Sequence, residues 1–345
     1  MNWQVIRASA LLRTSESMHR ERALSAGQGK ELRRLVREWA IPPYEIIRFG
    51  VHERPEAALD FVYDVETSAF HRLQNRRNPG AESDARLLED KLAATRELER
   101  IGIPMAPLLH CVPRRSRVSL AQQIGPEAAV FCKMRRGRGG RLAFSSRRIG
   151  EALSGSTLIG AALTGVNVEE AWRALLEVDD ALIQPLLRNH PALAPMAREG
   201  GLVTVRYISR RDGSCYCAIL EVPLEADVEA GTAANALIPI DGSSGALLGW
   251  PSGPPHAPYA ERLLSLARGR ASSLERLPWW EEIRTFSDIA QRRVDGLWAT
   301  AWDWAITPEG PLLLEGNAGW GLAVPQIVTG EPLALRLVHP APATD

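Results

Sequence analysis

The residues best suited to chemistry lie near the C-terminus, where Asp303, Glu315 and Asn317 interrupt the mostly apolar segment WDWAITPEGPLLLEGN. A turn at residues 307–311, bent by a proline and a glycine, would pair two strands so that Asp303 faces Glu315. Asn317, two residues further on, would share that face. Facing carboxylates destabilise a sheet unless something compensates, and three hard oxygen donors on one face suit Mg²⁺. The pattern therefore predicts a metal site formed by these three side chains.

The competing interpretation of this hairpin is a polar, solvent-facing strand. The predicted register places Ile306 opposite Leu312, and a β-bulge would change it. In this register the neighbours expected on the carboxylate face are Ala301, Ala305 and Leu313, all apolar. We therefore expect a semi-buried strip rather than an exposed one.

Lysine is rare in this chain and so draws attention to its positions. The chain has 41 Lys and Arg residues together, and the lysines are Lys30, Lys91 and Lys133. A retained lysine is a modest pointer to a site that needs a compact ammonium, although Lys30 fits an ordinary charged helix. Lys133 ends a predicted strand and precedes the loop RRGRGGR at residues 135–141. Glycines let a backbone close over a ligand, and their amides bind phosphate. Together with the carboxylate face, this loop indicates a nucleotide triphosphate, although it matches neither a Walker loop nor a dinucleotide fingerprint.

The elements that must position these residues follow from hydrophobic periodicity and from glycine and proline breaks. Helices are predicted at residues 29–40, 55–77, 84–101, 168–180 and 278–297. Strands are predicted at residues 129–134 and 181–187, and a hairpin at 202–224 that turns at 211–213. A glycine- and proline-rich stretch at 242–258 is expected on the surface. Because the strands pair locally, we expect an α+β fold with largely antiparallel sheets.

Composition excludes several classes of protein. The chain has 345 residues, 45% hydrophobic and 24% charged, with zero formal net charge. This mix is typical of a soluble globular protein and supports no nucleic-acid partner and no membrane partner. We find no apolar run long enough for a membrane span and no signal-peptide pattern, so a cytoplasmic location is expected. Four scattered cysteines and seven histidines show no disulfide or metal-binding spacing.

The order of these features resembles the ATP-grasp superfamily, and most closely the sugar-transfer-associated ATP-grasp family. The family ending GWD-A-T--GP--LEGN is similar to LWATAWDWAITPEGPLLLEGN at residues 297–317. The resemblance covers residues 84–325. It is supported by the segments DK to GIP (90–104), LIQP (182–185), QPLLRNHPAL (184–193), TVR (204–206) and LPWWEEI (277–283).

The resemblance implies an ATP-grasp fold, in which two α+β subdomains with mainly antiparallel sheets grip ATP, preceded by a mostly helical N-terminal region. The boundaries expected are 1–83 for the helical region, 84–180 for the small subdomain, 181–338 for the large subdomain, and 339–345 for a loose tail.

The resemblance also implies roles for individual residues, with ATP and one or two Mg²⁺ ions as cofactors. Lys91 and Lys133 would hold the α- and β-phosphates, and Arg206 would meet the γ-phosphate or an acyl phosphate. Asp303, Glu315 and Asn317 would bind the metal. Further nucleotide contacts would come from the lid glycines Gly137, Gly139 and Gly140, from the adenine-reading hinge Ile183, Gln184, Pro185 and Leu186, and from Asn235, with Asp241 in the same segment.

This chain departs from the family at three positions that flank these groups. Gln184 stands where many relatives have Glu, Met134 where Pro is usual, and no proline follows Asn317. No catalytic group is lost, but substrates are not transferable from any relative.

The function implied is an ATP- and Mg²⁺-dependent carboxylate–amine ligase that forms an amide through an acyl phosphate, with Lys133 and Arg206 as catalytic residues. Its partners would be a small-molecule carboxylate and an amine, in polysaccharide or in small-metabolite or peptide biosynthesis. The alternatives are a kinase that phosphorylates a small molecule or sugar, and a non-catalytic nucleotide-binding scaffold. Whether the chain forms a homodimer is left open.

Overall fold

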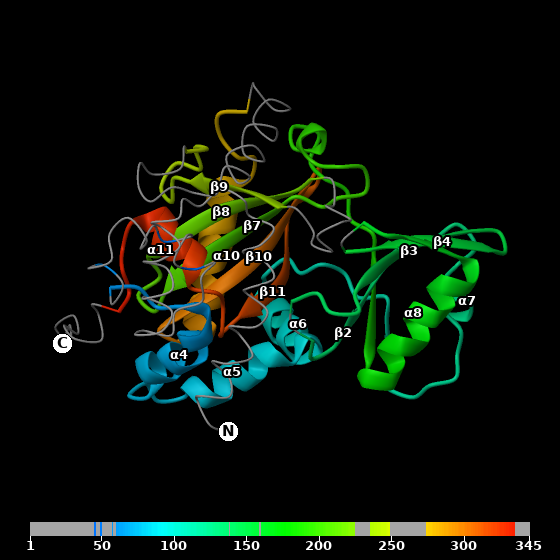
Figure 1. The fold of residues 1–345 in the computed structure, drawn as a ribbon, viewed down its shortest axis with the longest axis horizontal. Coiled ribbons are helices and arrows are strands. Elements are labelled where there is room, and N and C mark those ends of the chain that lie inside the picture. Colours follow the sequence, from blue (N-terminus) through cyan, green and yellow to red (C-terminus); the bar gives the residue numbers. More distant parts are fainter. Residues whose placement is uncertain are drawn as a thin grey trace, which may run out of the picture. The chain divides into compact units, whose positions relative to one another are not determined.

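The computed structural model describes residues 45, 49, 57, 60–137, 139–158, 160–224, 235–248 and 274–334 (Figure 1). The helix predicted at residues 29–40, most of the N-terminal region 1–83, much of the stretch 242–258 and the tail 339–345 lie outside these residues. Among the described helices, none is long and apolar enough to cross a membrane.

A six-stranded antiparallel sheet has the strand order β1-β6-β2-β3-β4-β5. Its strands are β1 (His110–Val112), β2 (Ala129–Met134), β3 (Phe144–Ile149), β4 (Ala152–Thr157), β5 (Ala162–Thr164) and β6 (Ala181–Pro185). Helix α8 (Gly165–Val178) packs on β2, β4 and β5, and the short α7 (Leu120–Gln123) lies near it (Figure 1). The core beneath α8 is centred on Trp172 and Phe144, both buried. This core holds β2 in place, and β2 carries Lys133.

A five-stranded antiparallel sheet has the order β11-β10-β7-β8-β9. Its strands are β7 (Thr204–Arg210), β8 (Cys215–Pro223), β9 (Asn235–Ile240), β10 (Ala299–Thr307) and β11 (Gly310–Asn317). A 3-10 turn at Ala194–Met196 precedes β7, and helix α10 (Trp280–Arg293) packs on β7 and β10 (Figure 1). The predicted hairpins at 202–224 and at the C-terminus are both present, so the α+β, mainly antiparallel class is confirmed.

Two buried tryptophans of β10 anchor this sheet on its helix-covered face. Trp302 donates its indole N–H to Ser209 Oγ at 3.1 Å, and Trp304 donates to Ser287 Oγ of α10 at 3.0 Å. Large buried aromatic side chains with satisfied polar groups stabilise a core without leaving an unpaired donor. Because side chains alternate along a strand, Asp303, the one residue between the two tryptophans, faces the other side of the sheet.

The helix predicted at 84–101 is two helices, α5 (Ala81–Glu89) and α6 (Lys91–Arg100). Asp90 interrupts them with an extended backbone, and its carboxylate accepts a hydrogen bond from the N–H of Ala93 at 3.2 Å. Aspartate competes with the helix backbone in this way and is favoured as an N-cap. The break makes Lys91 the first residue of α6. Gly102 ends that helix with a positive φ, as predicted.

The described residues fall into two compact units, and both sheets belong to the second. The first unit contains the 3-10 turn Asp64–Glu66 and α11 (Ala323–Thr329), and α4 (Thr67–Asn75) begins in it. Of the helix predicted at 55–77, residues 60–77 are described without a gap, and within them the α-helix begins at Thr67. The preceding main chain of Val62 is bound by the side chain of Gln326 at both N–H (3.0 Å) and C=O (2.8 Å).

The subdomain boundaries remain a prediction. The strand that follows the predicted boundary at residue 180, β6, pairs with β1 and β2 in the six-stranded sheet.

Candidate active site

Three charged side chains form a line across adjacent strands of the five-stranded sheet. Asp303 of β10 pairs directly with Glu315 of β11 on one side and with Arg206 of β7 on the other. Arg206 grips Asp303 through two hydrogen bonds, Nε to Oδ1 at 2.9 Å and Nη2 to Oδ2 at 3.1 Å. Such a forked guanidinium–carboxylate pair fixes both groups in orientation. The facing carboxylates predicted from the sequence are therefore present, with the positively charged guanidinium of Arg206 beside them.

The hairpin register around this pair differs from the prediction. Ile306 pairs with Pro311 rather than Leu312, so the turn is one residue tighter than expected. A β-bulge beside Asp303 then inserts Leu314 as an extra residue and restores the pairing of Asp303 with Glu315. The tighter turn also places Leu313 on the core face, opposite Trp304 and away from the carboxylates, which corrects the face predicted for it.

Asn317 and Glu221 complete the polar face. Asn317 donates through Nδ2 to Asp303 Oδ2 at 3.0 Å and to Glu315 Oε1 at 3.4 Å. Glu221 of β8 accepts from Arg206 Nη1 at 3.1 Å, so the guanidinium lies between two carboxylates. Sequence reasoning missed Glu221, although it is a lone acid in the apolar strand segment AILEVP. The alternation argument used for Asp303 applies to it equally.

Both predicted phosphate-binding lysines reach β11. Lys133 Nζ donates to the backbone oxygen of Leu314, the bulged residue, at 3.3 Å. Lys91 Nζ forms an ion pair with Glu315 Oε2 at 3.4 Å and donates to the backbone oxygen of Gly137. Four parts of the chain therefore meet at one point: α6, the end of β2, the glycine loop and β11.

Burial shapes the electrostatics of this face. It raises the pKa of Asp303 and of Glu221, and the neighbouring Arg206 acts in the opposite direction on both. Burial lowers the pKa of Lys133 to about 8, although Glu315 favours its charged form. Charged groups held in a partly buried site interact more strongly than they would in water. Such perturbed groups are typical of functional sites.

The glycine loop between β2 and β3 adopts conformations that favour glycine at two positions. Gly139 and Gly140 have φ of +62° and +65°, and a Cβ on Gly140 would lie 2.1 Å from Leu158 Cδ1. A Cβ on Gly137 would meet the side chain of Met134. The loop joins the strand that carries Lys133 to the next strand of the sheet.

The predicted hinge lies on β6, and part of its backbone is engaged by the protein. The carbonyl of Ile183 accepts from the N–H of Leu109 at 2.8 Å, and the N–H of Leu186 donates to Ala129 at 2.9 Å. Pro185 has no N–H to offer. The buried side chain of Gln184 donates to the carbonyl of Ala106 at 3.1 Å. Because these groups are already bonded within the protein, fewer backbone N–H and C=O groups of this segment remain to bind a nucleotide base.

Asn235 and Asp241 lie at the two ends of β9. Asn235 is exposed and opposite Pro223, and the strand registers place it on the same sheet face as Glu221 and Arg206. Asp241 accepts from the backbone and side chains of Ser243 and Ser244, so it closes a turn. The hydrogen bonds of Asp241 therefore give it a role in its own turn, whereas Asn235 lies on the sheet face that carries the charged residues.

The donor set fits a hard divalent cation. Among the described residues no group of three or more His, Cys, Asp or Glu side chains could hold a metal ion, so Asp303 and Glu315 would need Asn317 and non-protein oxygens. Mg²⁺ accepts such mixed shells, because it binds through one or two carboxylates and takes water and phosphate oxygens. Each carboxylate oxygen has two lone pairs, so the hydrogen bonds to Asp303 leave acceptor capacity. Rotating the amide of Asn317 by half a turn would present its oxygen in place of its nitrogen.

Comparison with known proteins places this geometry in context. The model of the family described as sugar-transfer associated ATP-grasp matches residues 69–340. No curated protein matches the chain. Among solved structures, the ATP-grasp ligase PsnB complexed with a minimal precursor aligns with a TM-score of 0.41 and 15% identity, over 76% of this chain and 61% of its own.

Two further solved structures align over a similar share of the chain. D-alanyl-alanine synthetase A from Vibrio cholerae O1 biovar eltor str. N16961 gives a TM-score of 0.39 and 13% identity, over 73% of this chain and 63% of its own. The ATP complex of D-alanine–D-alanine ligase from Bacillus anthracis gives a TM-score of 0.37 and 9% identity, over 73% of this chain and 68% of its own. This chain thus spans about three fifths of the length of PsnB. The family model covers both sheets and the whole polar face, and the chain accordingly has the ATP-grasp fold and belongs to the sugar-transfer-associated ATP-grasp family.

Proposed function

We propose that this protein is an ATP- and Mg²⁺-dependent ligase that joins a carboxylate to an amine through an acyl phosphate. The observation that carries the proposal is the line of Arg206, Asp303 and Glu315 across three strands, with both lysines reaching β11, the strand that carries Glu315. This line supports the proposal because it brings together cationic side chains and hard oxygen donors, the kinds of group that a triphosphate and its metal need. The residue roles predicted from the sequence remain part of this proposal.

In the first step, an oxygen of the substrate carboxylate attacks the γ-phosphorus, and the bond to the leaving ADP oxygen breaks. Mg²⁺, when bound by Asp303, Glu315 and Asn317, would neutralise charge on the phosphate oxygens. Lys133 and Lys91 would hold the phosphates, and Arg206 would stabilise the transferred group. Arg206 is suited to this because Asp303 and Glu221 hold its guanidinium in a defined orientation.

In the second step, the amine nitrogen attacks the acyl carbon, and the carbon–oxygen bond to phosphate breaks. The products are an amide and inorganic phosphate, and the amine loses its proton to a base. No side-chain nucleophile is needed. The residues described supply positioning and electrostatic stabilisation, which are the main contributions to phosphoryl transfer.

The test is the thermal stability of wild type and Glu315→Ala with ATP and Mg²⁺. Because a ligand at 100 times its Kd stabilises by about 2.7 kcal/mol, the wild type should unfold at a clearly higher temperature with both present. The variant should lose most of that shift. If millimolar ATP and Mg²⁺ leave the wild type unchanged, the nucleotide site is wrong. A search over acids and amines for ADP release then tests the reaction, and release that needs no amine would point to a kinase.

A further inference from the structure

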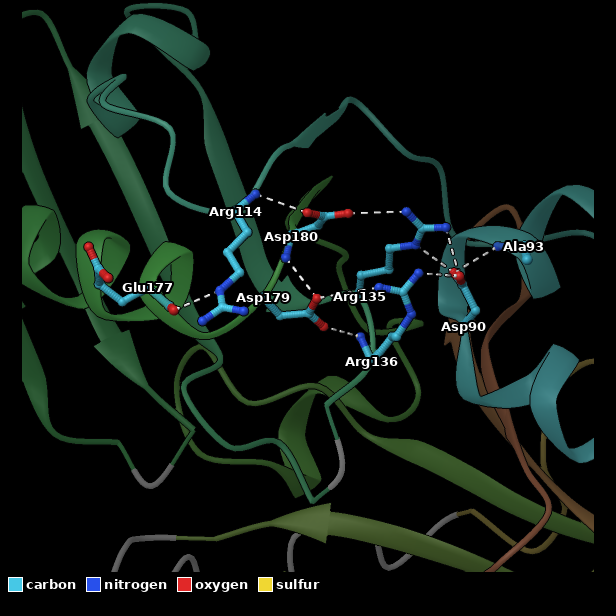
Figure 2. Close-up of polar contacts among 8 residues, drawn as sticks. All are labelled: Asp90, Ala93, Arg114, Arg135, Arg136, Glu177, Asp179 and Asp180. Carbon is cyan, nitrogen blue, oxygen red and sulfur yellow. Dashed lines mark hydrogen bonds and ion pairs between the residues drawn. The ribbon is translucent and has the colours of Figure 1, made fainter.

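A second charged cluster lies outside the predicted ligand set, at the junction of the elements that carry the two lysines (Figure 2). Arg135 donates to both carboxylate oxygens of Asp90 at 2.7 Å and to Asp180 Oδ2 at 3.1 Å. Arg136 donates to Asp90 Oδ2 at 3.0 Å. Asp180 in turn accepts from the backbone N–H of Arg114 at 2.9 Å. The guanidinium of Arg135 therefore bridges two carboxylates from separate parts of the chain.

The cluster is placed next to both lysines in the sequence. Asp90 directly precedes Lys91 and caps the helix that Lys91 opens. Arg135 lies two residues after Lys133, and its backbone oxygen accepts from the N–H of Lys91 at 3.1 Å. Its own N–H donates to the backbone oxygen of Asp180 at 2.9 Å. The start of α6, the end of β2 and the approach to β6 are thus joined by main-chain and side-chain bonds together.

The side chains of this cluster are only 17–24% exposed for Asp90, Arg135 and Asp180. Exposed ion pairs contribute little, because water and salt screen them. A forked pair shielded to this degree is screened less and has a defined geometry. It is therefore suited to holding backbone segments in register.

The position of the lysine backbones matters because the side chains are long and flexible. The two lysine head groups meet consecutive residues, Leu314 and Glu315 of β11. Holding a flexible lysine side chain in one place costs rotamer entropy, and the position of its backbone sets which points its ammonium can reach.

We propose that Asp90 and Arg135 are positioning residues that set Lys91 and Lys133 at the spacing at which both bind the phosphates of one nucleotide. The inference rests on the proposed function, because it assigns these residues a part in that site. In this proposal neither residue has to contact the nucleotide itself. Removing the groups that orient metal ligands typically costs about 10–100-fold in metal affinity or activity, and we expect an effect of similar size here.

The chain offers a matched control on the same helix. Glu97, near the other end of α6, also lies between two arginines, with Arg100 at 2.8 Å and Arg293 at 2.6 Å. It therefore repeats the chemistry of Asp90 away from both lysines. Asp90→Asn keeps a good N-cap while removing the charge. Glu97→Gln is the equivalent change at the control position.

The first measurement needs no nucleotide. Because the chain has only Lys30, Lys91 and Lys133 to acylate, limited acetylation followed by mass spectrometry reports each lysine separately. We expect Asp90→Asn and Arg135→Gln to raise the acetylation rates of Lys91 and Lys133 about tenfold relative to Lys30, and Glu97→Gln to leave them unchanged. The acetylation rate of Lys133 is the decisive measurement, because a change at Asp90 can affect Lys133 only through Arg135 in this proposal.

The second measurement is the Kd for ADP with Mg²⁺ by calorimetry, with thermal unfolding of each variant recorded alongside. We expect Asp90→Asn and Arg135→Gln each to weaken binding about tenfold, the double variant to be no weaker than either single one, and Glu97→Gln to bind normally. Unchanged acetylation in Asp90→Asn, or equal effects in Glu97→Gln, would overturn the positioning role. A wild type that binds no nucleotide, with acetylation still responding, would overturn the proposed function instead.

Discussion

Gly316 lies between Glu315 and Asn317, and adding a single methyl group there should disturb both the core and the polar face. A Cβ at this position would lie 2.4 Å from Cζ3 of Trp302 and 3.1 Å from Leu88. Carbon atoms in contact are usually 3.5–4.0 Å apart, so the ring or the strand must shift by about 1 Å. Trp302 is fully buried, and its indole N–H is bound to Ser209, so the ring has little freedom.

We therefore expect Gly316→Ala to lower the free energy of unfolding by about 1–3 kcal/mol, the usual cost of overpacking a core. Because the strand shift moves the flanking Glu315 and Asn317, stabilisation by ATP and Mg²⁺ should weaken as well. Unfolding in urea with and without the ligands measures both effects. The control is Gly165→Ala at the start of α8, where a Cβ meets nothing within 4 Å. That variant should be neutral or up to about 1 kcal/mol more stable. If Gly316→Ala unfolds at the urea concentration of wild type and keeps its ligand response, the argument from a rigid Trp302 is refuted.

Two further predictions concern charged groups. Burial of Asp90 acts to raise its pKa, but hydrogen bonds from Arg135 and Ala93 outweigh it and lower the pKa to about 2. Asp90 should therefore contribute about 2 kcal/mol of stability that is complete above its unfolded pKa near 4 and is lost as the pH falls towards 2. The difference in unfolding free energy between wild type and Asp90→Asn should shrink from pH 5 to pH 3, and a constant difference would contradict this. Glu221→Gln leaves Arg206 with one carboxylate partner, so we expect weaker binding of ATP with Mg²⁺ by calorimetry. Because burial raises the pKa of Glu221, loss of its charge should cost little stability in urea unfolding. Unchanged binding would show that Glu221 does not hold Arg206.

The carboxylate pair was predictable because it depends on local rules. Strand alternation and a turn with proline and glycine predict a hairpin in which Asp303 lies opposite Glu315. The predicted register was wrong by one residue at the turn. Asp303 still pairs with Glu315 because the bulge at Leu314 compensates for that shift. A bulge depends on the packing of both strand faces, so the sequence of one hairpin does not reveal it. The same bulge supplies the carbonyl that Lys133 contacts.

What the sequence by itself determined is the set of chemical groups, their order along the chain and their membership of short elements, because helix caps, turns and two-residue alternation act over a few residues. Only the tertiary structure decided which groups meet. Strand β10 lies between β11 and β7, so Arg206 reaches Asp303 across 97 residues of sequence and Lys133 reaches Leu314 across 181. Partners so far apart are chosen by which strands become neighbours when the whole core is buried, and no local pattern carries that information.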